Sequence, residues 1–195
     1  MTTSIYPFLK SYFYASVVST LLAIIPTNAG PLNVVSTLVS LACSVVCLYE
    51  LYQMRNISDH LNRAFLYQIG GLIGALVSLL VGLIVALANP RNVGFMMFTM
   101  VIALVFAVIA LMGSYHFYWG LDELIELNGY HYPLGRIKWC FYLTIIGGVV
   151  SWLCSLLGIG LLNMLITAGF SAAQLYLLWQ YIQAVRAREE DQPLL

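Results

Sequence analysis

The chain has 195 residues, of which 62% are hydrophobic and only 8% are charged, and its mean hydropathy is +0.90. Soluble domains carry about 25% charged residues, and a water-soluble fold of this size could not bury so much apolar surface. The composition therefore indicates an integral membrane protein surrounded by lipid. The formal net charge is zero, which argues against a nucleic-acid partner, because such a partner needs a basic face.

Six segments of the sequence are apolar over about the 20 residues that a helix needs to cross a bilayer. In chain order they are residues 9–25, 32–54, 65–88, 93–121, 137–157 and 160–185. We expect them to form one transmembrane domain, residues 1–195, of the all-α class: a polytopic membrane helix bundle of about six helices. The first segment also fits a cleaved signal peptide, whose removal would leave five spans.

The fourth segment continues as a helix beyond its apolar run. The helical pattern extends to about Leu127, and Asn128-Gly129 is a typical helix stop. At 1.5 Å per residue this helix is about 50 Å long, which exceeds the thickness of the hydrocarbon. We expect its end to project into the headgroups and to carry Asp122, Glu123 and Glu126 there as solvated acids.

Lysine and arginine predict the orientation, because they accumulate in cytoplasmic loops. With six spans, one side carries seven of the eight basic residues: Lys10, Arg55, Arg63, Arg136, Lys138, Arg186 and Arg188. Arg91 alone falls on the other side. We therefore expect a multi-pass protein with both termini in the cytoplasm.

Two short matches indicate an internal repeat. Gly71 stands seven residues before Ser78 in the third segment, and Gly148 stands seven residues before Ser155 in the fifth. In both cases a second glycine precedes and two leucines follow. Internal repeats are common in membrane proteins, and these matches predict three pseudo-repeated helical hairpins.

Small residues at four-residue spacing mark the helix faces that we expect to pack. Inside lipid, packing relies on small residues that let backbones approach, and this spacing places them on one face. The clearest ridges are Gly70, Gly74, Ser78 and Gly82 in the third segment and Gly147, Ser151 and Ser155 in the fifth. Ser40 and Ser44 belong to a similar ridge in the second segment. Intramolecular packing is the first interpretation, and a homo-oligomer interface or a ligand cleft is the second.

Aromatic residues are concentrated at the predicted inner side, which holds all 13 tyrosines. Several ionisable and amide side chains lie at the same level. Together they give a candidate ligand or partner site at the cytoplasmic rim: Tyr49, Glu50, His116, Trp119, Glu123, Trp179 and Gln183. An interfacial aromatic belt with solvated acids is the first interpretation. A vestibule that faces the cytoplasm is the functional alternative.

No segment carries a motif for catalysis or for a cofactor. The patterns H-E-x-x-H, G-x-S-x-G and the Walker loop are absent from the sequence. Cys43 and Cys47 lie one helical turn apart in an apolar run, and we interpret all four cysteines as small hydrophobic residues. His116 and Glu123 share a helix face but are too few to ligate a metal. We expect no catalytic residue, no cofactor and no metal, and hence no enzyme.

These expectations favour a non-enzymatic accessory or scaffold subunit of a membrane assembly. Its partners would be the lipid bilayer, other membrane subunits or a second copy of the chain. The alternative is a membrane-embedded carrier or substrate-binding subunit for a small amphiphilic or aromatic solute. For this alternative, the length and the six predicted spans resemble the substrate-binding components of vitamin uptake systems. The short loops resemble those of small bacterial membrane proteins, so we expect a bacterial cell membrane.

Overall fold

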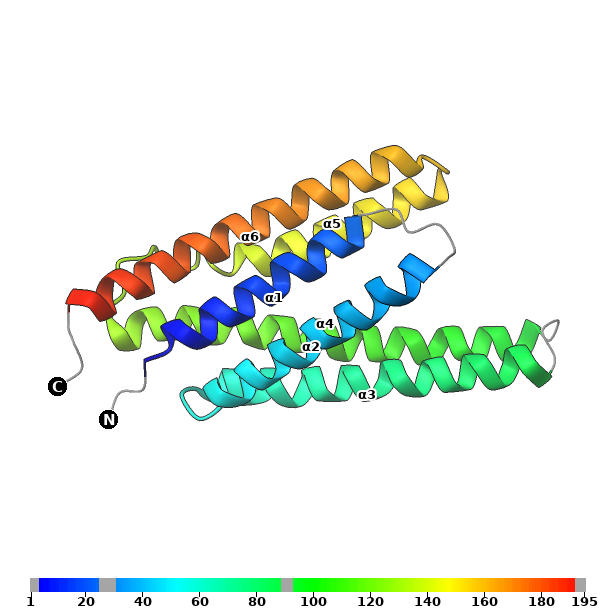
Figure 1. The fold of residues 1–195 in the computed structure, drawn as a ribbon, viewed down its shortest axis with the longest axis horizontal. Helices are drawn as coiled ribbons and strands as arrows, with labels where there is room; N and C mark the ends of the chain where they lie inside the picture. Colours follow the sequence, from blue (N-terminus) through cyan, green and yellow to red (C-terminus); the bar gives the residue numbers. More distant parts are fainter. Residues whose placement is uncertain (1–3, 25–30, 89–92, 192–195) are drawn as a thin grey trace.

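Six α-helices form the described part of the protein. The computed structural model describes residues 4–24, 31–88 and 93–191 (Figure 1). The helices are α1 (Tyr6–Ile24), α2 (Pro31–Met54), α3 (Asp59–Ala88), α4 (Val93–Asn128), α5 (Trp139–Leu156) and α6 (Gly160–Asp191). No strand occurs within these residues, which confirms the predicted all-α class. Each helix covers one of the six apolar segments.

Three of the described helical segments are long and apolar enough to cross a membrane: Met100–Asn128, Trp139–Leu156 and Gly160–Asp191. Within the most apolar window of each segment, at most 17% of the residues are buried inside the protein. Apolar surface of this extent is not stable against water, so the protein belongs in a membrane. The full count of six spans stays a prediction.

Helix α4 ends where the sequence predicts. It has 36 residues and its last residue is Asn128. Gly129 then adopts a φ of 64°, a left-handed conformation that glycine reaches without steric cost. The backbone N–H groups of Gly129 and Tyr130 both donate to the Ile125 carbonyl, at 3.0 and 3.3 Å. The predicted Asn128-Gly129 stop is therefore confirmed, and the helix is about 54 Å long.

Consecutive helices pair as three antiparallel hairpins, α1 with α2, α3 with α4 and α5 with α6 (Figure 1). Contacts within these pairs are the most extensive in the molecule, and α1 with α6 comes next. Contacts of α2 with α3 and of α4 with α5 are fewer. Each hairpin is thus a packed unit, and the hairpins meet one another over a smaller area. The sequence repeat between them stays a prediction.

Glycines of the predicted ridges lie where two helices come close. A Cβ atom on Gly74 would lie 1.8 Å from the ring of Phe106 in α4, so no larger residue fits there without a shift. A Cβ atom on Gly147 would lie 3.1 Å from Phe170 in α6. Ser151 hydrogen-bonds Asn163 of α6. These ridge positions face the partner helix of the same hairpin, as tight packing inside lipid requires.

The remaining described ridge residues make looser contacts or bond within their own helix. A Cβ atom on Gly70 would lie 3.4 Å from Ile109 of α4, an ordinary contact. Ser78 is partly buried, and Ser155 donates a hydrogen bond to the Ser151 carbonyl of its own helix at 3.0 Å. Gly82 lies outside the residues whose contacts the structure describes.

One end of the bundle holds the main hydrophobic core. Figure 1 places the α2–α3 and α4–α5 turns at this end, together with the start of α1 and the end of α6. All six helices contribute buried residues, which we call the rim core: Ile5, Leu9, Leu51, Met54, Leu61, Ala64, Phe117, Leu121, Leu124, Ile125, Tyr130, Tyr132, Ile137, Cys140, Leu178, Tyr181, Ile182 and Val185. The bundle is therefore sealed by side-chain packing at this end.

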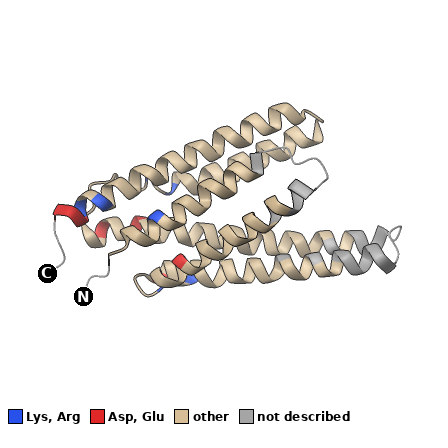
Figure 2. Cartoon of the chain, viewed as in Figure 1, with Lys and Arg blue, Asp and Glu red and all other residues tan. Residues whose placement is uncertain are grey.

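Charged side chains gather at the same end. Figure 2 shows the described lysines, arginines, aspartates and glutamates near the turns and the termini of the bundle. Arg91, the one basic residue predicted on the opposite side, lies outside the described residues. The clustering agrees with a single polar face, and which side of the membrane it occupies stays a prediction.

The first and last helices are tied together by a carboxylate. Glu189, near the end of α6, accepts hydrogen bonds from the backbone N–H groups of Ile5 and Tyr6 at 3.0 and 3.4 Å. Its other oxygen accepts from the Ser4 hydroxyl. The N–H groups at the start of a helix have no partner within the helix, and a negative charge there is favourable. Glu189 therefore caps α1 from the opposite end of the sequence.

Candidate functional site

Among the predicted rim residues, His116 pairs with a second histidine. The Nδ1 atoms of His116 and His60 lie 2.9 Å apart, so one ring donates and the other accepts. The ring of Tyr67 stacks on His116 with a centroid distance of 5.4 Å and an interplanar angle of 1°. These contacts join α4 to the start of α3. His116 is buried, with 7% of its surface exposed.

Glu123 reaches the same part of α3. Its carboxylate accepts a hydrogen bond from the Ser58 hydroxyl. Ser58 itself accepts from the backbone N–H of His60 at 3.1 Å, which makes it an N-terminal cap of α3. Glu123 is partly buried. Its hydrogen bond holds a helix cap in place, so its role is more than that of the solvated acid expected from the sequence.

The two tryptophans of the predicted rim contact other helices. The ring of Trp119 lies 5.8 Å from the Phe141 ring of α5, and the Lys138 ammonium lies 5.1 Å from the Trp119 ring. Trp179 of α6 lies 5.3 Å from the Phe13 ring of α1. The aromatic side chains thus link α4 to α5 and α6 to α1.

The other three rim residues have no described contact that joins them to this group. Tyr49 is 58% exposed, and Glu50 and Gln183 are partly buried. The contacts of the other four residues are spread over different helix pairs, so the described geometry does not gather the seven around one opening. The vestibule stays a prediction.

Asp122 forms the strongest electrostatic contact at the rim. One carboxylate oxygen lies 2.7 Å from the Lys138 ammonium, and the other accepts the Gly135 N–H at 2.6 Å. Only 7% of Asp122 is exposed, so the expectation that it is solvated is wrong. The turn between α4 and α5 folds back over the carboxylate. The charge is satisfied by a cation and a backbone donor, as a buried carboxylate requires.

Two tyrosines of the same turn are held in an apolar setting. The Tyr132 hydroxyl donates to the Leu177 carbonyl at 3.2 Å, and both Tyr130 and Tyr132 pack edge-on against Tyr181. Burial disfavours the phenolate and raises the pKa of Tyr130 and of Tyr132 to about 12. Both side chains are therefore neutral structural groups at ordinary pH.

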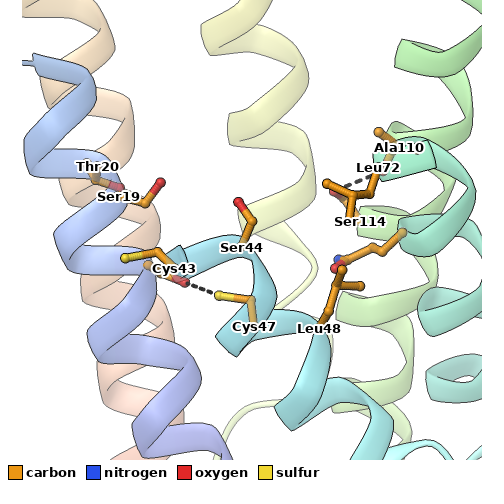
Figure 3. A pocket seen from close by; sticks show the side chains of 12 residues that line it. Ser19, Thr20, Cys43, Ser44, Cys47, Leu48, Leu72, Ala110 and Ser114 are labelled. Carbon is orange, nitrogen blue, oxygen red and sulfur yellow. Dashed lines mark hydrogen bonds between the residues drawn. The ribbon is translucent and has the colours of Figure 1, made fainter. Parts of the chain in front are cut away.

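A cavity lies between the first two hairpins, away from the predicted rim site. Its volume is about 430 Å³. It is lined by residues of α1, α2, α3 and α4: Ser16, Ser19, Thr20, Cys43, Ser44, Cys47, Leu48, Gln68, Gly71, Leu72, Ala110 and Ser114. Figure 3 shows Ser19, Ser44 and Ser114 around the same space on three different helices. We call this space the four-helix cavity.

The four-helix cavity lies about halfway along the helices and is open to one side, where Ser44 and Ala110 are exposed. Ala110, one of its lining residues, is at the midpoint of α4. Gln68 is nine residues after the first residue of α3, which is about 14 Å along that helix.

The lining is polar but carries no formal charge. Five hydroxyls, two thiols and one primary amide line it, together with apolar or small side chains. Three of the hydroxyls donate to backbone carbonyls one helical turn earlier: Ser16 to Tyr12 at 2.9 Å, Ser44 to Ser40 at 2.9 Å and Ser114 to Ala110 at 3.3 Å. Such back-bonding satisfies a hydroxyl proton in an apolar environment.

Sequence reasoning missed this cavity although its residues were visible. Ser44 was assigned to a packing ridge, and Cys43 and Cys47 were interpreted as small hydrophobic residues. The four-residue spacing is the same for a helix that packs and for a helix that lines a cavity, so it could not separate the two. Gln68, an amide in an apolar segment, was the one distinctive signal. None of the seven predicted rim residues lines the cavity.

No group of three or more histidine, cysteine or acidic side chains is placed to hold a metal ion within residues 4–24, 31–88 and 93–191. The chain was also compared with known proteins. Neither a scan of protein-family models nor searches of curated proteins and of solved structures find a match to it. The four-helix cavity, rather than a known relative, is therefore the starting point for its function.

Proposed function

We propose that this protein is a membrane-embedded carrier, or the substrate-binding subunit of one, and that its solute occupies the four-helix cavity. The observation that carries the proposal is a cavity of about 430 Å³ with a polar lining on helices of a membrane protein. Pockets for small molecules measure about 300–1,000 Å³. Polar groups inside a membrane helix are costly and are retained mainly where they have a function.

The proposal includes the membrane arrangement expected from the sequence: six spans, three related hairpins and both termini in the cytoplasm. Support comes from the charged residues that gather at one end of the bundle and from the positive-inside rule. The rim residues then serve to hold the helix ends together, as the contacts of His116, Trp119 and Glu123 do.

The proposal assigns no catalytic chemistry to the cavity. Among its lining residues there is no carboxylate, imidazole or amine that could act as a general base at neutral pH. A serine or cysteine without such a partner is a weak nucleophile. Binding and passage of a solute need neither group.

A thermal-shift screen of the purified chain tests the proposal. We expect one class among vitamins, lipids, amphiphiles, polyols and amides to raise the unfolding temperature by several degrees, because a ligand that binds the folded state stabilises it. Leu48→Trp places a large ring in the cavity and should abolish the shift. Leu41→Trp is the matched control, because Leu41 is on the same helix but is exposed and outside the lining. A screen without any shift would contradict the proposal.

An accessory or scaffold subunit is the second candidate, and the surface of α2 favours it. Between Val35 and Val46 no described residue of α2 is buried, so this stretch has room for a partner helix as well as for lipid. A photo-crosslinking residue at Val39 in native membranes should then trap a specific protein. Crosslinks to lipid alone would leave the carrier as the better proposal.

A further inference from the structure

We infer that the solute of the four-helix cavity is an uncharged, non-aromatic small molecule with several O–H or N–H groups, as in a polyol or a primary amide. This inference rests on the proposed function of the cavity and adds the chemical class of its occupant. It follows from which hydrogen-bonding capacities of the lining are already used and from which groups the lining lacks.

Three of the five lining hydroxyls offer acceptor capacity to a bound molecule. The hydroxyl protons of Ser16, Ser44 and Ser114 are donated to backbone carbonyls of their own helices. A hydroxyl has one proton and two lone pairs, so each of these oxygens still has acceptor capacity after its proton is used. The Cys47 thiol also donates to a backbone carbonyl, that of Tyr12, at 3.9 Å. A molecule rich in donors complements such a surface.

Gln68 adds the one primary amide of the lining. Its side chain lies close to the side chain of Tyr12. An amide has two N–H donors and a carbonyl acceptor, so one contact leaves capacity for a second molecule. A solute that combines donors with a few acceptors, such as a polyol or an amide, matches Gln68 and the serine oxygens together.

Charged solutes do not fit the cavity. Among the described lining residues there is no lysine, arginine, histidine, aspartate or glutamate. An ion placed there would lose its hydration without gaining a counter-ion, which is strongly unfavourable in a low-dielectric environment. The cavity therefore selects against ions by the cost of desolvation.

Aromatic solutes also lack their usual partners. None of the lining residues is aromatic, so a ring in the cavity would find no face or edge to stack on. The aromatic side chains of this protein lie instead at the rim, where Trp119 and Trp179 contact protein rings. An aromatic solute, which the sequence also allows, is thus the less favoured class for this cavity.

Calorimetry on the full chain in nanodiscs tests the inference with matched probes. The probes are a panel of short polyols and primary amides, their fully O- or N-methylated analogues, their carboxylate analogues and indole. At least one polyol or amide should bind, whereas its methylated analogue, its carboxylate analogue and indole should not. Ser44→Ala with Ser114→Ala should weaken that binding about thirtyfold, since each of the two lost acceptors contributes about 1 kcal/mol.

The control variant is Ser155→Ala. Ser155 also donates to a carbonyl of its own helix but lies outside the cavity lining, so the affinity should not change. Binding of indole or of a methylated analogue, with no binding of the donor-rich probes, would overturn the inference and leave the carrier proposal standing. A panel that binds nothing, together with no shift in the wider thermal screen, would remove both. Binding that is insensitive to the two serine substitutions would also overturn the inference.

Discussion

The rim core and the four-helix cavity are built by opposite means. In the rim core, side chains from all six helices are almost completely buried, and the large residues Tyr181, Phe117 and Leu121 are at most 1% exposed. Around the cavity the helices carry small polar residues such as Ser16 and Ser44, and space remains between them. The first region is closed by packing, and the second is left open by the same helices.

The difference follows from the two surroundings. Burial of apolar groups is strongly favourable where the alternative is water, and the charged residues around the rim core show that water reaches this end (Figure 2). Inside lipid that advantage disappears, and small residues and hydrogen bonds hold helices together instead. The rim core therefore supplies stability, and the deeper half is free to carry a site.

Removal of a large rim-core side chain should have the largest effect on stability, and it tests directly whether the rim core supplies that stability. Tyr181 is fully buried and donates to the Leu121 carbonyl at 2.9 Å. We expect Tyr181→Ala to lower the free energy of unfolding by about 3–5 kcal/mol, because it leaves a large void. Tyr181→Phe, which loses only the hydrogen bond, should cost about 1 kcal/mol.

Unfolding in mixed micelles with increasing denaturing detergent measures both variants. Tyr176→Ala is the control on the same helix, because Tyr176 is 60% exposed and its loss should change stability by less than about 0.5 kcal/mol. Equal losses for the two alanine variants would show that the rim core does not dominate stability.

A second substitution tests how much the stability of the lipid-embedded half depends on close approach of the helix backbones. Gly74→Val would place a Cβ atom 1.8 Å from the Phe106 ring. We expect this overpacking to cost about 1–3 kcal/mol and to loosen the α3–α4 hairpin. Gly148→Ala is the control, since a Cβ atom there has nothing within 4 Å. The same unfolding measurement should show a loss for the first variant only.

Alkaline pH sharpens the comparison through the buried tyrosines of the turn between α4 and α5. Burial raises the pKa of Tyr130 and Tyr132 to about 12, whereas an unfolded tyrosine ionises near pH 10. Because the folded pKa is the higher one, the contribution of both groups is complete below pH 10 and is lost between about pH 10 and 12.

Thermal unfolding across this pH window tests the effect. The double variant Tyr130→Phe with Tyr132→Phe cannot ionise at these positions, so its unfolding temperature should fall less steeply than that of the unmodified chain. Parallel curves for the two proteins would show that other groups control the alkaline transition.

The helices could be predicted from sequence, but the candidate site could not. Hydropathy locates the six segments, and Asn128-Gly129 marks the end of α4, because both signals are local. The four-helix cavity depends on how one hairpin rests against the next, which no local pattern encodes. The ion pair of Asp122 with Lys138 could not be predicted for the same reason. The turn between α4 and α5 brings these two residues together, although they are not neighbours in the sequence.

The cap that Glu189 places on α1 has a consequence for biosynthesis. The first helix leaves the ribosome long before its cap, so the N–H groups of Ile5 and Tyr6 stay without that partner until α6 has been made. The contacts of α1 with α6 likewise form only after α6 has been made. The ring of helices is therefore completed only when α6 has been translated, and a nascent chain that stops before α6 presents an unfinished surface to quality control.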